Sequence, residues 1–306
     1  MKRVLVTGAS GFIGRHCLPL LLERGYEVHA ASSQAKSGTE EAVYWHQTNL
    51  LERGQTSQLL AEVKPDYLLH LAWYAVPGLY WKSPENLSWV EASLHLLQEF
   101  TRQGGKRLVM AGSCAEYDWK YGFCSELTTP TNPSSLYGTS KHALQLILNA
   151  FAAEAGISSA WGRIFWLYGP HEYPNRLVAS ISRALLMGQE ARSTHGNQIR
   201  DFLHVEDVAA AFVALMESKV QGPVNIASGQ PVTLKQIISK IADLTGRADL
   251  LRLGAIAAPA DEAPLVVADV RRLTQTVGWL PRYDLDSGLT QMIEWWKTEL
   301  NRERTN

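Results

Sequence analysis

Two side chains that could transfer a proton lie four positions apart in the middle of the chain. They are Tyr137 and Lys141 of the segment LYGTSK, and on a helix this spacing places them on the same face. A phenol with a pKa near ~10 is a poor base at neutral pH, but an adjacent ammonium stabilises the phenolate. The pair therefore suits acid–base catalysis, although the same spacing also occurs in ordinary helix packing and on solvated surfaces.

A second set of residues suits phosphate binding. Residues 7–14 read TGASGFIG and directly follow an apolar run that predicts a strand. Gly8 would allow a tight turn, Gly11 would let the backbone approach a pyrophosphate, and Gly14 would let helix and strand pack closely. The N–H groups and positive dipole end of the following helix would face the anion. We predict a dinucleotide site here, the alternative being a purely structural turn; the expected contacts are Gly8, Ser10, Gly11, Phe12, Ile13 and Gly14.

The end of the second predicted strand bears on which dinucleotide binds. An acidic side chain there commonly binds the ribose hydroxyls of NAD, but residues 30–36 read AASSQAK and contain no Asp or Glu. The hydroxyls of Ser32 and Ser33, with Lys36 and Arg15 nearby, suit a ribose phosphate better. We therefore expect NADP(H), with NAD(H) as the alternative if these serines are plain loop residues.

The elements that must position these residues alternate along the first half of the chain. Short apolar runs are separated by helical patterns, which is typical of βαβ units and a parallel sheet. The predicted strands are 3–7, 27–31, 43–45, 67–72, 107–111 and 159–165, and the predicted helices are 12–23, 55–62, 84–103 and 134–155.

The pattern loosens after about residue 166. It predicts helices over 177–187, 205–217, 233–245 and 285–300, and a strand over 223–227. We expect an α/β fold with a doubly wound (Rossmann) parallel sheet in residues 1–165. Residues 166–306 would form a smaller α/β lobe for substrate, with about 200–226 returning to the first lobe.

Composition narrows the class of protein. The chain has 306 residues, 46% of them hydrophobic and 19% charged, and a formal net charge of −1. That balance predicts a globular protein with a large core, and it predicts no positively charged surface that would bind nucleic acid or an anionic membrane. No apolar run reaches the ~18 residues of a membrane helix. Three cysteines without metal spacing (Cys17, Cys114, Cys124) predict a reducing, cytoplasmic location without disulfides and no metal site.

Four of the ten tryptophans fall in stretches that read as loops. Such side chains could form the wall of a ligand pocket. Packing of the core or of a covering loop is the alternative for each of them. The four are Trp73, Trp81, Trp119 and Trp166.

Further segments follow in a recognisable order along nearly the whole chain. After TGASGFIG come HLAW (70–73), AGSCAEY (111–117), LYGTSK (136–141), RIFWLYGP (163–170), RDFLHVEDVA (200–209) and NIASG (225–229). Together they resemble the extended short-chain dehydrogenases/reductases, the NAD(P)-dependent epimerase/dehydratase family that acts on nucleotide sugars. Several motifs in the right order are far more specific than any one of them.

The resemblance implies roles for individual residues. Tyr137 would be the general acid or base at a sugar oxygen, Lys141 would hold the nicotinamide ribose and lower the pKa of the tyrosine, and Ser113 would hydrogen-bond the same oxygen. Hydride would pass between the nicotinamide and a sugar carbon. Further implied cofactor contacts are Asn49, Leu50, Leu71, Ala72, Trp73 and Phe165, and implied substrate contacts are Tyr74, Trp166, Asn175, Arg176 and Arg200.

Departures from the family pattern reduce the number of reactions that this chain is expected to catalyse. Its dehydratases carry an Asp-Glu pair directly after the serine, where this chain has Cys114 and Ala115, and Glu116 comes one place too late. Its epimerase-reductases place a cysteine where Ala115 stands. The remaining Ser-Tyr-Lys set suits a ketoreductase acting at C4 of a nucleotide-linked deoxysugar. The alternatives are an NAD-dependent nucleotide-sugar 4-epimerase and a non-catalytic cofactor-binding scaffold.

Other departures concern substrate and assembly. Trp166 stands where the family usually has an Asn that binds the diphosphate, and residues 258–265 lack the arginine that often clamps it. A nucleotide sugar is still expected, with a sugar lacking the nucleotide as the alternative. Family members commonly dimerise through two helices, here 84–103 and 134–155. Their surplus of apolar residues (Leu94, Leu97, Phe100, Leu144, Ile147, Leu148 and Phe151) predicts a homodimer.

Overall fold

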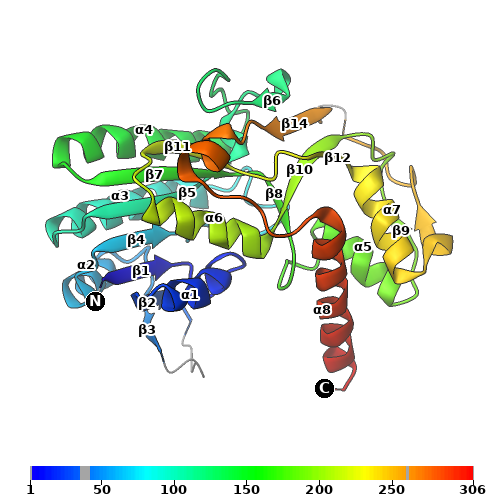
Figure 1. Cartoon of the computed structure of the whole chain (residues 1–306), viewed down its shortest axis with the longest axis horizontal. Coiled ribbons are helices and arrows are strands. Elements are labelled where there is room, and N and C mark those ends of the chain that lie inside the picture. Colours follow the sequence, from blue (N-terminus) through cyan, green and yellow to red (C-terminus); the bar gives the residue numbers. More distant parts are fainter. Residues whose placement is uncertain (1, 35–41, 260–261, 306) are drawn as a thin grey trace.

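A computed structural model describes residues 2–34, 42–259 and 262–305 of the chain. Figure 1 shows a larger lobe built on a wide sheet and a smaller lobe that carries the last helix. Lys36, one of the cations expected near the ribose, lies outside the described residues. No described helix combines the length and apolar character needed to cross a membrane.

The larger lobe contains a seven-stranded sheet in which every described pairing is parallel. Its order is β11-β7-β5-β4-β1-β2-β3, so the strand order reverses between β1 and β4. In open α/β sheets, ligands bind outside the carboxyl ends of the strands at such a reversal. The strands are β1 (Arg3–Thr7), β2 (Glu27–Ser32), β3 (Val43–Gln47), β4 (Tyr67–His70), β5 (Arg107–Ser113), β7 (Ser158–Ile164) and β11 (Gly222–Ile226).

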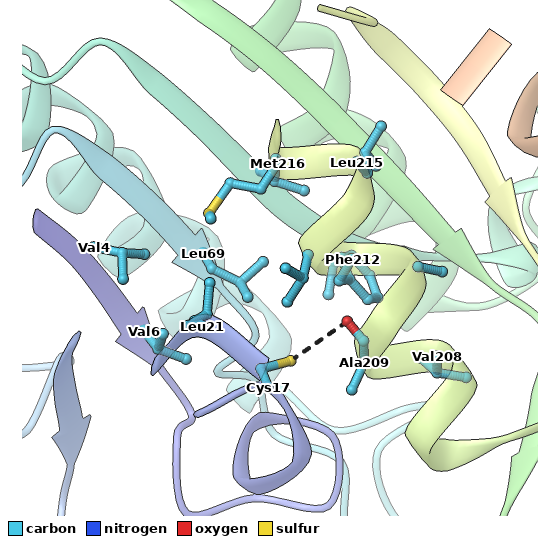
Figure 2. Packing of buried hydrophobic residues seen from close by; sticks show 14 of the residues in the cluster. Val4, Val6, Cys17, Leu21, Leu69, Val208, Ala209, Phe212, Leu215 and Met216 are labelled. Atoms are coloured by element: carbon cyan, nitrogen blue, oxygen red, sulfur yellow. Dashed lines mark hydrogen bonds between the residues drawn. The ribbon is translucent and has the colours of Figure 1, made fainter. Parts of the chain in front are cut away.

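Helices cover both faces of this sheet, which explains why its central strands are mostly apolar. On one face α1 (Gly14–Glu23) packs against α6 (Val205–Glu217). Figure 2 shows the core between them, where the Cys17 thiol lies 3.9 Å from the Ala209 carbonyl. The other face carries α2 (Arg53–Val63), α3 (Glu85–Arg102) and α4 (Leu136–Ala155).

The smaller lobe interleaves with the larger one along the chain. Its mixed sheet has the order β12-β10-β14-β6, with β8 also paired to β10. An apolar cluster between this sheet and three helices forms its core. The strands are β6 (Phe123–Cys124), β8 (Trp166–Tyr168), β10 (Ile199–His204), β12 (Pro231–Thr233) and β14 (Leu265–Ala268), with a separate pair β9 (Ala191–Arg192) and β13 (Leu251–Arg252), and the helices are α5 (Leu177–Leu186), α7 (Leu234–Thr245) and α8 (Leu285–Thr305).

The fold confirms the expected α/β class with a parallel sheet and a smaller C-terminal lobe. Local expectations differ in several places: the short strands β6, β8, β9, β12, β13 and β14 were not expected, and Trp166 lies on β8 rather than in a loop. The fourth strand ends at His70 rather than at 72, and β10 was not expected because its Arg200 and Asp201 are charged. Both charges are buried and partnered: Asp201 accepts hydrogen bonds from Ser228 and Gly229, and Arg200 pairs with Glu262.

The apolar residues cited for a dimer do not support one in this structure. Leu97, Phe100, Leu144 and Leu148 are fully buried in the core beneath α3 and α4. Of the seven, only Ile147 is exposed, at 44%. The homodimer therefore stays a prediction. The three cysteines are free thiols and all are buried.

Candidate active site

The reversal point of the sheet holds a cavity of about 290 Å³. Its walls come from the residues that follow β1, β4 and β5, from the end of β7 and the start of β8, from the start of α4 and from Arg176 before α5, so six separate segments converge on it. The lining residues are Gly8, Gly11, Phe12, Ile13, Gly14, Leu71, Ala72, Trp73, Ala75, Tyr80, Trp81, Ala111, Gly112, Ser113, Cys114, Trp119, Tyr137, Lys141, Ile164, Phe165, Trp166, Leu167 and Arg176.

The glycine-rich turn has the shape that a dinucleotide needs. Gly8 has a φ of +66°, and a Cβ on it would lie 2.7 Å from the backbone nitrogen of Ala72. A Cβ on Gly14 would lie 2.2 Å from the Gly8 carbonyl oxygen. Only glycine therefore lets this turn close against the strand and the neighbouring segment.

The N-terminus of α1 is free to bind an anion. No side chain caps it, and its first turn contains no acidic residue. Its orphan N–H groups and positive dipole end thus face the cavity beside Gly11 and Ile13. These features fit the pyrophosphate of a dinucleotide.

The residues expected near the adenosine ribose lie outside the cavity lining but close to one another. The Ser10 and Ser32 hydroxyl oxygens are 3.2 Å apart, which joins the turn to the end of β2. The Arg15 guanidinium donates to the carbonyls of Ser10 and Gly11, and burial lowers its pKa. Ser33, directly after β2, is exposed.

Asn49 and Leu50 follow β3 and do not line the cavity. The Asn49 side chain accepts from the backbone N–H of Leu51, and its own backbone N–H donates to Gln55. Leu50 is buried in the core. The Asn49 side-chain oxygen thus already has a hydrogen-bond partner within its own loop.

Ser113 is held at the end of β5 by a buried acid. Its backbone N–H donates to Glu116 Oε1 at 2.8 Å, and its hydroxyl accepts from the Ala115 N–H. Glu116 is fully buried and forms an ion pair with Arg163 at 2.7 Å, while Trp161 donates to the same carboxylate. Glu116 therefore points into the protein, away from the cavity.

Tyr137 is placed by the first turn of α4. Ser135 caps this helix by accepting from the Gly138 N–H, and the Tyr137 N–H donates to the Trp81 carbonyl. A Cβ on Gly138 would lie 2.3 Å from the Ala115 carbonyl oxygen. The helix start thus packs backbone against backbone on the turn after Ser113, which brings the phenol and the serine hydroxyl together.

The environment of Tyr137 keeps its phenol protonated. Burial raises its pKa, and the neighbouring Tyr80 adds to the rise, whereas a hydrogen bond with the Ser113 side chain opposes it. Burial determines the direction of this shift, and the expected lowering by Lys141 stays a prediction. A protonated phenol is a proton donor rather than a base.

Lys141 lies one helical turn further on and is almost fully buried. Its Nζ donates to the Ala111 carbonyl at 2.8 Å and lies 3.6 Å from the centroid of the Trp73 ring. Burial lowers its pKa to about 7, against a smaller opposing effect of Glu116.

Aromatic rings form much of the remaining wall. The four tryptophans expected in loops all line this one cavity. Trp81 meets Tyr137 and Trp119 edge to face at 5.7 Å and 6.0 Å between centroids, and Trp119 lies 5.7 Å from Trp166. Phe165, expected as a cofactor contact, also lines it.

The expected substrate contacts divide into two groups. Trp166 and Arg176 line the cavity, whereas Tyr74, Asn175 and Arg200 do not. Asn175 is exposed. Arg200 is buried behind Trp166, with its guanidinium 5.0 Å from that ring and 3.1 Å from a Glu262 oxygen.

Sequence reasoning missed several lining residues, two of which carry a polar group. Tyr80 contacts the Tyr137 ring edge to face at 4.8 Å, and Cys114 lies directly after Ser113. The segment 75–83 contains no periodic pattern that would have placed Tyr80. Cys114 was named as a departure from the Asp-Glu pair of the dehydratases but not as a lining residue, and burial raises the pKa of its thiol.

Comparison with known proteins identifies the family. Residues 4–227 match the model of the NAD dependent epimerase/dehydratase family. The chain belongs to this family. The match covers the glycine-rich turn, Ser113, Tyr137 and Lys141, so the family is established over the segments that build the cavity.

Two relatives indicate the range of reactions in this family. UDP-glucuronic acid decarboxylase 1 of Xenopus tropicalis is 27% identical over 317 residues, covering 100% of this chain and 74% of the relative. The dTDP-6-deoxy-L-talose 4-dehydrogenase (NAD(+)) of Aggregatibacter actinomycetemcomitans is 26% identical over 245 residues, covering 78% of this chain and 88% of the relative.

Two solved structures share the whole fold. UDP-glucose 4-epimerase of Thermotoga maritima, determined with UDP-glucose, has a TM-score of 0.89 at 25% identity, covering 97% of this chain and 99% of its own. MoeE5, determined with UDP-glucose and NAD, has a TM-score of 0.84 at 31% identity with the same coverage. Because this neighbour binds NAD, the comparisons do not support the expected preference for NADP(H).

Proposed function

We propose that this enzyme reduces a keto group, at C4 of a nucleotide-linked deoxysugar, with Tyr137 as the proton donor. The observation that carries the proposal is the chemistry of the cavity wall. Ser113, Tyr137 and Lys141 converge on it, and none of the described lining residues is Asp or Glu. Elimination of water from a sugar needs such a carboxylate, whereas reduction of a carbonyl needs only a proton donor and a hydride source.

The chain would supply position and the proton. A reduced nicotinamide, when bound beside Lys141, supplies the hydride. The Tyr137 phenol would donate its proton to the carbonyl oxygen, and the Ser113 hydroxyl would hydrogen-bond the same oxygen. The phenol is protonated at neutral pH, as this direction requires, because the pKa of Tyr137 does not fall below the ordinary value of ~10. The relative named as a 4-dehydrogenase of a deoxysugar nucleotide supports the substrate class.

The wall suggests how the sugar nucleotide would lie. Trp81, Trp119 and Trp166 offer flat apolar faces on which the C–H side of a sugar ring can pack. Arg176 is the lining cation apart from Lys141 among the described residues, and it would bind the diphosphate. In place of the usual Asn, Trp166 would hold the ring rather than the phosphates.

For the cofactor we propose NADP(H) ahead of NAD(H). Support comes from the cluster of Ser10, Ser32 and the Arg15 guanidinium at the end of β2, which offers donors and no carboxylate among the described residues. Fluorescence titration of the purified enzyme with both reduced cofactors tests this proposal. Tighter binding of NADH than of NADPH would overturn it.

A reductase assay tests the reaction itself. NADPH oxidation, followed by absorbance, is expected with a 4-keto-6-deoxy sugar nucleotide. Tyr137→Phe should lower kcat by roughly 10²–10⁴-fold while cofactor binding persists. The control is Tyr121→Phe, an exposed tyrosine outside the cavity, which should leave kcat unchanged. Wild-type activity in Tyr137→Phe would refute the proton-donor role.

The same assay separates the alternatives. Steady conversion of a UDP-hexose to its C4 epimer without added cofactor would replace the reductase by a 4-epimerase, which the structural similarity to UDP-glucose 4-epimerase makes the second candidate. Tight cofactor binding with no turnover of keto sugar or UDP-hexose would favour a non-catalytic scaffold.

A further inference from the structure

The ammonium of Lys141 rests on the face of an indole ring. Its Nζ lies 3.6 Å from the centroid of Trp73, well inside the ~6 Å range of a cation–π contact. Both side chains face the same cavity, and Lys141 is 4% exposed. Desolvation of the ammonium makes such a contact stronger than it is at a surface.

The ring is held in this orientation by a separate set of hydrogen bonds. Trp73 Nε1 donates to Asn86 Oδ1 at 2.9 Å. The Asn86 amide nitrogen in turn donates to the carbonyls of Tyr80 and Ser83 at 2.7 Å and 2.8 Å. Asn86 is fully buried in the first turn of α3. The tilt of the indole is therefore fixed by α3 and not by Lys141.

We propose that Trp73 is a positioning residue that holds Lys141 in its charged form and in a fixed rotamer. The consequence for catalysis rests on the proposed function, whereas the contact between Trp73 and Lys141 is independent of it. An aromatic face attracts the ammonium without a lone pair that takes one of its three N–H donors. With one donor used by Ala111, the others stay available for ribose hydroxyls, whereas a carboxylate partner would accept one of them.

The charge of Lys141 needs this support because few neighbours provide any. Burial lowers its pKa to about 7 and Glu116, from the turn after β5, raises it. His70 on β4 is neutral at physiological pH, since burial lowers its pKa to about 3. Tyr137 on the same helix is a protonated phenol. Among the described residues, Trp73 thus joins the Ala111 carbonyl as a direct contact that favours the ammonium over the amine.

The experiment measures the pKa of Lys141 in the cofactor-free protein. Lysine is isotope-labelled at Cε, its chemical shift is followed against pH by NMR, and Lys141→Met assigns the signal. Trp73→Leu should lower the pKa of Lys141 by about one unit, since a desolvated cation–π contact is lost. Trp73→Phe keeps a weaker aromatic face, so the pKa of Lys141 in this variant should lie between the wild-type value and the Trp73→Leu value. Trp119→Leu, which removes a ring from the same cavity but not from Lys141, should leave the pKa unchanged.

Each other outcome overturns the proposal. An unchanged pKa in Trp73→Leu, with thermal unfolding like that of the wild type, would show that the ring does not stabilise the charge. A raised pKa would show that Trp73 acts only by excluding water. Equal shifts in the Leu and Phe variants would assign the effect to the Asn86 hydrogen bond. Because no substrate or cofactor is used, failure here is separate from failure of the reductase assay.

Discussion

Removing the Glu116 carboxylate should damage both the fold and the placement of Ser113. Glu116→Ala would leave the guanidinium of Arg163 buried without its partner, at 3% side-chain exposure. Breaking a buried ion pair from one side costs about 3–5 kcal/mol. The Ser113 N–H and the Trp161 indole N–H would also lose their acceptor. We therefore expect the free energy of unfolding to fall by about 3–5 kcal/mol or more.

Urea unfolding followed by tryptophan fluorescence measures this loss, and kcat in the reductase assay reports the displacement of Ser113. Misplacement of a catalytic group by ~1 Å can cost about a hundredfold in rate. Glu294→Ala serves as the control, because its ion pair with Lys297 lies on an exposed helix surface. That variant should change stability by less than about 1 kcal/mol.

A double variant separates the charge from the shape. Glu116→Leu combined with Arg163→Met removes both charges, so it should lose less stability than the sum of the two single changes. A loss below about 1 kcal/mol in Glu116→Ala would refute the reasoning, since it would mean that water or another group accepts the freed donors. Additive losses in the double variant would likewise show that the two charges do not depend on each other.

Two further predictions follow from single side chains. Burial raises the pKa of Glu172 to about 8, and its Oε2 has no hydrogen-bond partner among the described residues. The folded state therefore favours the protonated carboxyl. The contribution of that preference to the free energy of unfolding is complete below about pH 4.5 and is lost as pH rises through 8. Glu172→Gln should remove this dependence of stability on pH, which urea denaturation of both proteins at pH 5 and pH 8.5 would check. If stability fell as steeply between these pH values in the variant as in the wild type, Glu172 would not be the responsible group. Ser32→Asp should shift cofactor binding from NADPH towards NADH, because a carboxylate repels the ribose phosphate and accepts from ribose hydroxyls; titration with both cofactors measures it, and an unchanged ratio would exclude Ser32 from the ribose site.

Sequence reasoning located the backbone-determined parts of the site well. Gly8 and Gly14 are required by close approaches of the chain to itself, so their spacing alone indicates the turn. Ser113, Tyr137 and Lys141 follow a strand end and a helix start, whose positions the apolar periodicity predicts. The α/β class follows from the same periodicity.

The side-chain pairings could not be predicted, because they join distant segments. Arg200 and Glu262 are 62 positions apart, and nothing in the strand-like stretch before Val205 shows that its charges are buried and paired. The contact between Trp73 and Lys141 depends on a loop whose course no periodic pattern defines. The net direction of the Tyr137 pKa shift could likewise not be predicted, since it depends on burial by distant segments such as the loop containing Tyr80.

The late position of α6 and β11 has a consequence for synthesis on the ribosome. The larger lobe receives its last strand at Gly222, 58 positions after β7 ends at Ile164. At ~5–20 residues per second, the nascent chain waits roughly 3–12 s for that strand. Until α6 emerges, the apolar surface around Val6 and Leu69 lacks the cover that Figure 2 shows. The larger lobe therefore cannot complete its core co-translationally before the segment from β8 to β10 of the smaller lobe has been made, and its apolar surface is exposed to aggregation during that interval.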